Sequence, residues 1–190
     1  SLPGEDTVKV TAGERKVVVL PEGDYSATVT TETGETEQVD VAIHNGFWRL
    51  FNRDSVFVLN VAGASVLVWQ EATYRPAPEK GEIRHEVYLG KPFLALECID
   101  YAFQDMPQQV RAESGSTVIR RALTVLEQPL PQTVQWALLE GLPPGEVMGF
   151  AETHLSYQPG NEALAEAYTN AVLQAGAAER GAEFLRKGLS

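Results

Sequence analysis

The chain has 190 residues, of which 44% are apolar, so it can bury the core of one medium domain or of two small ones. Its formal charge of −11 and its pI near 4.7 argue against nucleic acid and anionic lipid as partners, because both bind basic surfaces. The single cysteine, Cys98, excludes an internal disulfide and a multi-cysteine metal site.

The first forty residues predict short β-strands. Val8 and Val10 alternate with polar residues over 7–11, and a valine-rich run follows at 17–20; each run is followed by a glycine turn. The clearest strand pair is a hairpin formed by residues 24–31 and 36–43, with a turn at Gly34. This part of the chain therefore indicates half-buried antiparallel sheet.

The hairpin also carries a resemblance to a known family. Residues 19–29 read Val-Leu-Pro-Glu-Gly-Asp-Tyr-Ser-Ala-Thr-Val, and Gly34 and Val39-Asp40-Val41 follow. The segment resembles the Pro-x-Gly-x-Tyr-x-x-x-Val hairpins of PEGA-like and related prealbumin-like small β-sandwich modules. The resemblance covers this hairpin, implies a β-sandwich fold and assigns no functional residue.

The next region, residues 47–69, is the densest in β-forming side chains. Three runs, at 47–51, 55–61 and 65–69, are separated by two turn signals, which predicts a β-meander in the middle of a sheet. Strand patterns continue at 83–89 and 93–103. Residues 117–126 fit both a strand and a helix, and their Thr, Val and Ile content favours a strand. We expect about nine to eleven short strands in an antiparallel β-sandwich-like domain spanning residues 1–128.

Beyond residues 127–131 alanine, leucine, glutamate and glutamine replace the β-branched residues, which predicts helices over 129–190. Pro131 is suited to the first turn of the first helix, which runs to Gly141. Residues 146–157 form the second helix, Asn161 caps the third, and residues 177–189 form the fourth. The apolar spacing of each helix predicts its inward-facing residues, which in chain order are Val134, Leu138, Leu139, Val147, Phe150, Ala151, Leu155, Leu164, Tyr168, Ala171, Val172, Ala178, Ala182, Leu185 and Leu189. The expected fold class is therefore α+β, with about four helices after the sheets.

The helices resemble tetratricopeptide (TPR) repeats. Phe150 and Phe184 are 34 residues apart, as are Leu155 and Leu189, which is the TPR period. The run 155–164 also resembles the junction between consecutive TPR units. The aromatic-plus-glycine pattern of the first TPR helix is absent, and Trp136 is out of register. The resemblance implies stacked helical hairpins with a concave surface that binds protein.

The candidates for catalysis are few. Cys98 is expected in mid-strand between Glu97 and Asp100, whose charges oppose thiolate formation, so we interpret it as a buried structural residue. The three histidines have no metal-binding spacing and are interpreted as surface or hydrogen-bonded residues. His85 alternates with apolar neighbours, and it faces a pocket or Cys98 if the two strands pair.

The aromatic residues offer a second kind of site. Four of them form a sugar-stacking platform if they are exposed and belong to the hydrophobic core if they are buried: Tyr25, Trp48, Trp69 and Tyr74. The dense apolar surroundings of both tryptophans favour the core.

The sequence as a whole favours a non-catalytic protein–protein interaction or scaffolding module of a larger protein. The alternatives are a carbohydrate- or envelope-binding β-sandwich and a cysteine-dependent enzyme using Cys98 and His85. No cofactor or metal is predicted, and neither nucleic-acid binding nor membrane insertion is expected. The compartment stays open, with the cytoplasm favoured. Because the chain begins without Met, we interpret it as a piece of a longer protein, and any signal or anchor would lie outside these 190 residues.

The expected binding surface is helical. Residues 131–190 carry seven glutamates against Arg180, Arg186 and Lys187, a net charge of 3 − 7 = −4. Glu152, Glu162 and Glu166 are expected to project away from the apolar stripes of their helices. We therefore expect a basic protein or peptide partner, such as an amphipathic helix flanked by Lys or Arg.

Overall fold

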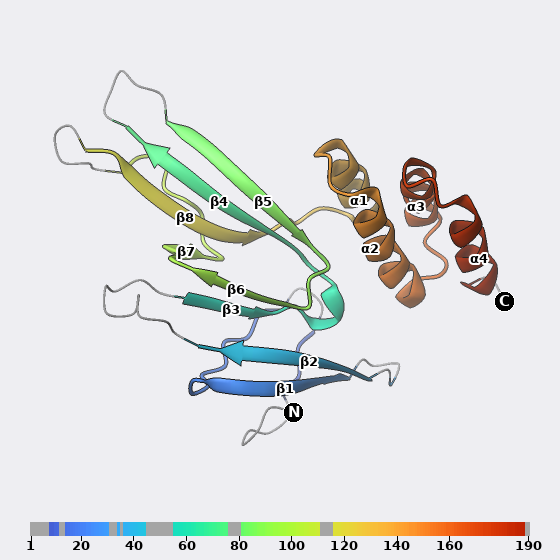
Figure 1. The fold of residues 1–190 in the computed structure, drawn as a ribbon, viewed down its shortest axis with the longest axis horizontal. Helices are drawn as coiled ribbons and strands as arrows, with labels where there is room; N and C mark the ends of the chain where they lie inside the picture. The colour runs from blue at the N-terminus through green and yellow to red at the C-terminus, as the bar shows by residue number, and fades with distance from the viewer. Residues whose placement is uncertain are drawn as a thin grey trace. The chain divides into compact units, whose positions relative to one another are not determined.

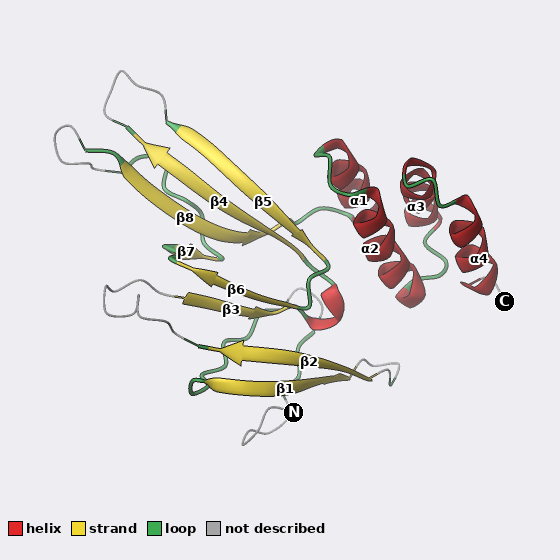
Figure 2. Ribbon diagram, in the orientation of Figure 1, coloured by secondary structure: helices red, strands yellow, loops and turns green. Residues whose placement is uncertain are grey.

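The computed structural model describes residues 8–11, 14–30, 34, 36–44, 55–75, 81–110 and 116–188. Sheets come first along the chain and four helices follow, so the expected α+β class is confirmed (Figures 1 and 2). The strands are β1 (Gly23–Thr30), β2 (Thr36–Ile43), β3 (Ser55–Leu59), β4 (Val66–Tyr74), β5 (Glu82–Leu89), β6 (Phe93–Glu97), β7 (Tyr101–Ala102) and β8 (Val118–Val125). The helices are α1 (Leu130–Leu139), α2 (Pro144–Tyr157), α3 (Glu162–Gln174) and α4 (Ala178–Gly188).

The hairpin of β1 and β2 is antiparallel, as the alternating pattern predicted. Its register pairs Ala27 with Val39, and these two residues are buried in one small core with Val29 and Val41. Leu59 of β3 and Phe93 of β6 pack against the same core. Because every second residue of a strand faces the same side, the polar residues of the hairpin remain on its solvent face.

The predicted meander is wrong where it can be examined. Its first run, 47–51, lies outside the described residues. β3 pairs with β6 rather than with β4, in antiparallel register from Ser55 opposite Glu97 to Leu59 opposite Phe93. A 3-10 turn, Val61–Gly63, replaces the expected tight hairpin between β3 and β4. The backbone N–H of Asn60 instead donates to Pro92 O at 2.8 Å, which extends the β3–β6 pairing.

The largest sheet has the strand order β5-β4-β8-β7. Residues 118–125 form a strand, as the Thr, Val and Ile content predicted. β7 and β8 run parallel, which departs from the expected antiparallel arrangement. A second departure concerns the N-terminal runs: the described residues 8–11 and 14–20 are assigned to no strand.

The chain divides into two compact units. The first comprises Ser1–Ala62, Trp69–His85 and Lys91–Leu123, and the second comprises Gly63–Val68, Glu86–Gly90 and Thr124–Ser190. The second unit thus combines the four helices with two short segments of strand sequence. Whether residues 1–128 fold separately from 129–190 stays a prediction.

The core of the second unit is built by the first three helices. Its buried residues include Val147, Phe150, Ala151 and Leu155 of α2, together with Leu164, Tyr168, Ala171 and Val172 of α3, as their helical spacing predicted. Val66 and Leu89 from the strand segments join this core. Asn161 caps α3, its side chain accepting a hydrogen bond from the Leu164 N–H at 3.1 Å.

Three inward positions were predicted wrongly. Leu139, at the end of α1, is 87% exposed, and Ala178 and Ala182 of α4 are exposed too. Instead, α4 packs against α3 through Gly181, which is buried. At this contact the close approach to Val172 leaves no room for a side chain.

An offset of 34 residues relates the two helical hairpins. Adding 34 to Pro144, the first residue of α2, gives Ala178, the first residue of α4. The same offset maps the buried residues of α1 onto buried residues of α3: Thr133, Val134 and Ala137 correspond to Ala167, Tyr168 and Ala171. The sequence period is therefore matched by a periodic pattern of burial.

Candidate functional site

The surface of α1 and α3 is the first candidate site. The two helices pack together, with Cα atoms within 8 Å of each other. Links of four residues, 140–143 and 158–161, reverse the chain twice, so α1 and α3 run in the same direction. Leu139 and Leu173 are equivalent under the 34-residue offset, and they are 87% and 66% exposed. The two hairpins thus each present one exposed leucine near the end of the equivalent helix.

The segment of the chain that includes this surface is acidic. Residues 124–179 contain no Lys or Arg, and they contain seven glutamates: Glu127, Glu140, Glu146, Glu152, Glu162, Glu166 and Glu179. Glu162 and Glu166 are exposed on α3, four residues apart and therefore on one side of the helix. Both lie as the sequence predicted, away from the buried residues Leu164 and Tyr168.

Glu152 was predicted to project into solvent, and this prediction is wrong. Its Oε1 accepts a hydrogen bond from the hydroxyl of Tyr168 at 2.9 Å, and its Oε2 lies 2.6 Å from Nη2 of Arg180. The Glu152 side chain is only 15% exposed. Burial of Tyr168, together with its hydrogen bond to Glu152, raises the pKa of the tyrosine. Glu152 therefore joins α2, α3 and α4 and belongs to the structure of the helical unit.

The aromatic residues predicted as a sugar platform are separated by the fold. Tyr25 is half-buried on β1, and its hydroxyl donates to Pro21 O at 2.6 Å. Trp69 and Tyr74 are half-buried on β4, five positions apart, so the alternation of the strand directs them to opposite faces. Trp48 lies outside the described residues. The described members of this set thus share no single sheet face.

Cys98 and His85 lie on elements that do not pair. Cys98 follows the last residue of β6 and has a φ of +60°, so the predicted mid-strand position is wrong. It is half-buried rather than buried. His85 is exposed on β5, which belongs to the four-stranded sheet, whereas β6 pairs with β3. Strand pairing therefore gives no geometric support to a cysteine–histidine pair.

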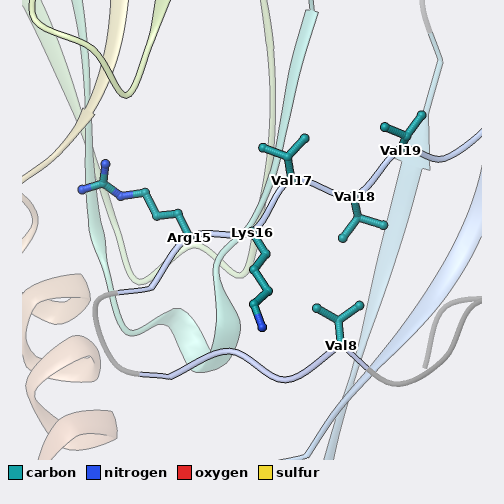
Figure 3. Close-up of a pocket in the computed structure, with 6 residues that line it drawn as sticks. All are labelled: Val8, Arg15, Lys16, Val17, Val18 and Val19. Atoms are coloured by element: carbon teal, nitrogen blue, oxygen red, sulfur yellow. The ribbon is translucent and has the colours of Figure 1, made fainter.

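A shallow groove lies along the N-terminal segment, lined by Val8 and residues 15–19. Figure 3 shows the side chains of this segment alternating, with Lys16 and Val18 directed toward Val8, and Val17 and Val19 directed away. Val17 is 95% exposed. The guanidinium of Arg15 lies 5.3 Å from the ring centroid of Phe103. The segment keeps the period of a strand, but its geometry brings together no set of reactive groups.

His154 was interpreted as a surface or hydrogen-bonded histidine, and the structure agrees only with the second description. It is buried and forms a hydrogen bond with the backbone of Ala64, whereas its Nε2 has no hydrogen-bond partner within the part of the chain that is described. The signal was present in the sequence, because His154 follows Phe150 by four residues and lies between the buried positions Ala151 and Leu155. The periodicity that predicted the apolar face of α2 thus includes His154.

Among the described residues, no group of three or more His, Cys, Asp or Glu side chains is placed to hold a metal ion. None of the helices in the described ranges is both long and apolar enough to cross a membrane. Comparisons of the chain with protein families, with curated proteins and with solved structures find no match. The functional argument therefore rests on the geometry of this chain itself.

Proposed function

We propose that this chain is a non-catalytic protein–protein interaction or scaffolding module that binds its partner through the surface of α1 and α3. The observation that carries the proposal is the 34-residue offset between the two helical hairpins, which maps the buried residues of α1 onto buried residues of α3. Repeated hairpins stacked in this way form extended binding surfaces in solenoid proteins. The offset supports the TPR-like interpretation of the helices.

The chemistry of the surface indicates the kind of partner. Glu162 and Glu166 are exposed, and no Lys or Arg in residues 124–179 neutralises them. Leu139 and Leu173 add exposed apolar area near the ends of the two helices. A partner segment with Lys or Arg beside aliphatic residues complements both features, as an amphipathic helix does. Association with such a partner weakens as salt is added.

The test compares two charge reversals of equal size in the intact chain. Glu162→Lys/Glu166→Lys changes the helical surface, and Glu37→Lys/Asp40→Lys changes two exposed positions of β2 by the same charge. We expect the helical variant to lose partners that the wild-type chain captures at low salt, and the β2 variant to keep them. Circular dichroism checks that both variants remain folded, since exposed charges contribute little to stability.

Three outcomes count against the proposal. If capture of the partner does not change with salt concentration, electrostatic attraction does not drive the association. Loss of the partner in the β2 variant alone places the binding surface on the sheets. Retention of the partner by the helical variant, with unchanged association rate, shows that Glu162 and Glu166 are not part of the interface.

A further inference from the structure

His154 of α2 contacts the turn that lies between β3 and β4. His154 lies on the buried side of α2 and is 8% exposed. The ring of Phe150, one helical turn earlier, meets the imidazole edge-on with the centroids 4.5 Å apart. The imidazole forms a hydrogen bond with the backbone of Ala64, while Nε2 is buried without a partner among the described residues. These residues all belong to the second compact unit.

The turn against α2 has a tightly packed backbone. Gly63 and Gly90 have φ values of +60° and +61°, a region that favours glycine. A Cβ on Gly63 lies only 2.7 Å from Gly90 O, and a Cβ on Gly90 lies 3.4 Å from Cδ2 of Phe150. Gly63 thus packs against Gly90, and Gly90 packs against Phe150, the residue whose ring contacts His154. This packing depends on backbone positions and is sensitive to any rearrangement of the ring beside it.

Among the described residues of the second unit, no opposite charge is shown beside the imidazole. The turn, residues 61–66, and helix α1, residues 130–139, contain no ionisable side chain. The acidic groups of the other elements of the unit have other partners or face solvent. Glu152 binds Tyr168 and Arg180, Glu86 accepts a hydrogen bond from Tyr88, and Glu183 pairs with Lys187. The remaining glutamates are exposed: Glu127, Glu140, Glu146, Glu162, Glu166 and Glu179. Lys91, next to Gly90, is exposed too.

We propose that His154 is a pH switch: its neutral imidazole holds α2 against the turn at Gly63–Ser65, and protonation of the ring releases this contact. Protonation turns the unpartnered Nε2 into a buried N–H donor with a positive charge beside Phe150. An unpaired buried charge is costly, so the protein avoids the cost by opening the contact and admitting water. The inference is independent of the binding surface proposed for α1 and α3.

The direction of the pH dependence follows from the burial of the ring. Burial lowers the pKa of His154, and the bond with the Ala64 backbone raises it only in part. The folded chain therefore binds the proton less readily than the unfolded chain. Stability is unaffected above the ordinary histidine pKa of about 6.5 and decreases as the pH falls below it, until the folded form takes up the proton. In that window the unfolding equilibrium constant rises up to about tenfold for each pH unit.

The experiment measures urea unfolding of the whole chain from about pH 7.5 to about pH 5, the range in which histidine titrates. His154→Gln removes the titration but keeps an N–H that can donate to Ala64. We expect the free energy of unfolding of the variant to depend less on pH than that of wild type, by the contribution of one titrating proton. His85→Gln, at an exposed position of β5, is the matched control for the loss of one histidine. Equal slopes in wild type and His154→Gln would falsify the proposal.

A second measurement covers the case in which His154→Gln fails to fold. The imidazole of His154 is followed by NMR in the wild-type chain, together with hydrogen exchange of the amides of Ala64–Leu67. We expect the ring to titrate below the ordinary histidine pKa and the amides to lose protection as the pH falls. Titration at or above the ordinary value, or protection that does not change with pH, overturns the pH switch.

Discussion

Replacing Gly181 by Ala tests the packing of α4 on α3. A Cβ at this position lies 2.5 Å and 2.7 Å from the two γ carbons of Val172, well inside van der Waals contact. Forcing an extra methyl group into a packed core costs about 1–3 kcal/mol, and the better helix propensity of alanine returns about 1 kcal/mol. We therefore expect Gly181→Ala to lower the free energy of unfolding by up to about 2 kcal/mol, or to leave it unchanged if Val172 moves easily.

Gly149→Ala is the matched control, because Gly149 also lies inside a helix, α2, and a Cβ there meets nothing within 4 Å. This variant gains helix propensity without a clash, so its stability rises by up to about 1 kcal/mol. Urea unfolding followed by circular dichroism gives both values. In a Val172→Ala background the penalty of Gly181→Ala disappears if the two side chains clash as described. If Gly181→Ala stabilises the chain as much as Gly149→Ala does, α4 does not pack on α3 at this contact.

Two further predictions use the same unfolding assay, and a third uses the circular dichroism spectrum of a shortened chain. Asn161→Ala removes the cap that accepts from Leu164 and costs about 1 kcal/mol; an unchanged midpoint contradicts the cap. Glu152→Ala leaves the buried hydroxyl of Tyr168 without its acceptor and costs about 1–3 kcal/mol, whereas Glu152→Gln keeps an acceptor and costs less; equal costs contradict this role. Residues 1–128 alone remain soluble and β-rich if the predicted domain boundary is real, and a disordered circular dichroism spectrum argues for one fused core.

Local patterns predicted the elements well wherever neighbouring residues decide the structure. The β1–β2 hairpin follows from alternation and a turn glycine, and its register, with Ala27 opposite Val39, follows from the same pattern. The helices of the C-terminal part begin and end near the proline, glycine and asparagine residues that predicted them. Residues 117–126 were predicted as a strand from their side-chain types and from the turn residues before them, and the structure has a strand at Val118–Val125.

Sequence patterns failed where the partner of an element is distant in the chain. β3 has a strand-like composition that fits β4 as well as β6, and nothing in 55–59 identifies residues 93–97 as its partner. The choice depends on the turn at Val61–Gly63, in which Ala62 has a φ of 54° and Gly63 lies against Gly90. This contact joins two turns that are 27 residues apart in the sequence (90 − 63), so no local pattern predicts it.

The candidate site was predicted in part. Exposure of Glu162 and Glu166 follows from helical periodicity, but Glu152 has the same periodicity relative to its own helix and is nevertheless paired with Arg180. Whether an acidic residue faces solvent or a neighbouring helix depends on how the helices stack, which the pattern within one helix does not contain. For the same reason the exposure of Leu139 was missed.

A substitution at Glu166 distinguishes a role in the stability of the fold from a role in binding. Glu162 lies in the first turn of α3, where a carboxylate stabilises the helix dipole, so the fold alone accounts for it. Glu166 lies beyond the first turn, and its like charge four residues from Glu162 disfavours the helix by a few tenths of a kcal/mol. Glu166→Lys converts this repulsion into a favourable Glu–Lys pair, so the free energy of unfolding should stay the same or rise slightly.

The same substitution should slow association with a basic partner, since it places a positive charge on the proposed surface. Stability and association therefore move in opposite directions if Glu166 serves binding. Measuring both on the single variant is decisive, because damage to the fold lowers the two together. A Glu166→Lys chain that is less stable than wild type, or that binds the partner at the wild-type rate, shows that Glu166 has a structural role or none at this surface.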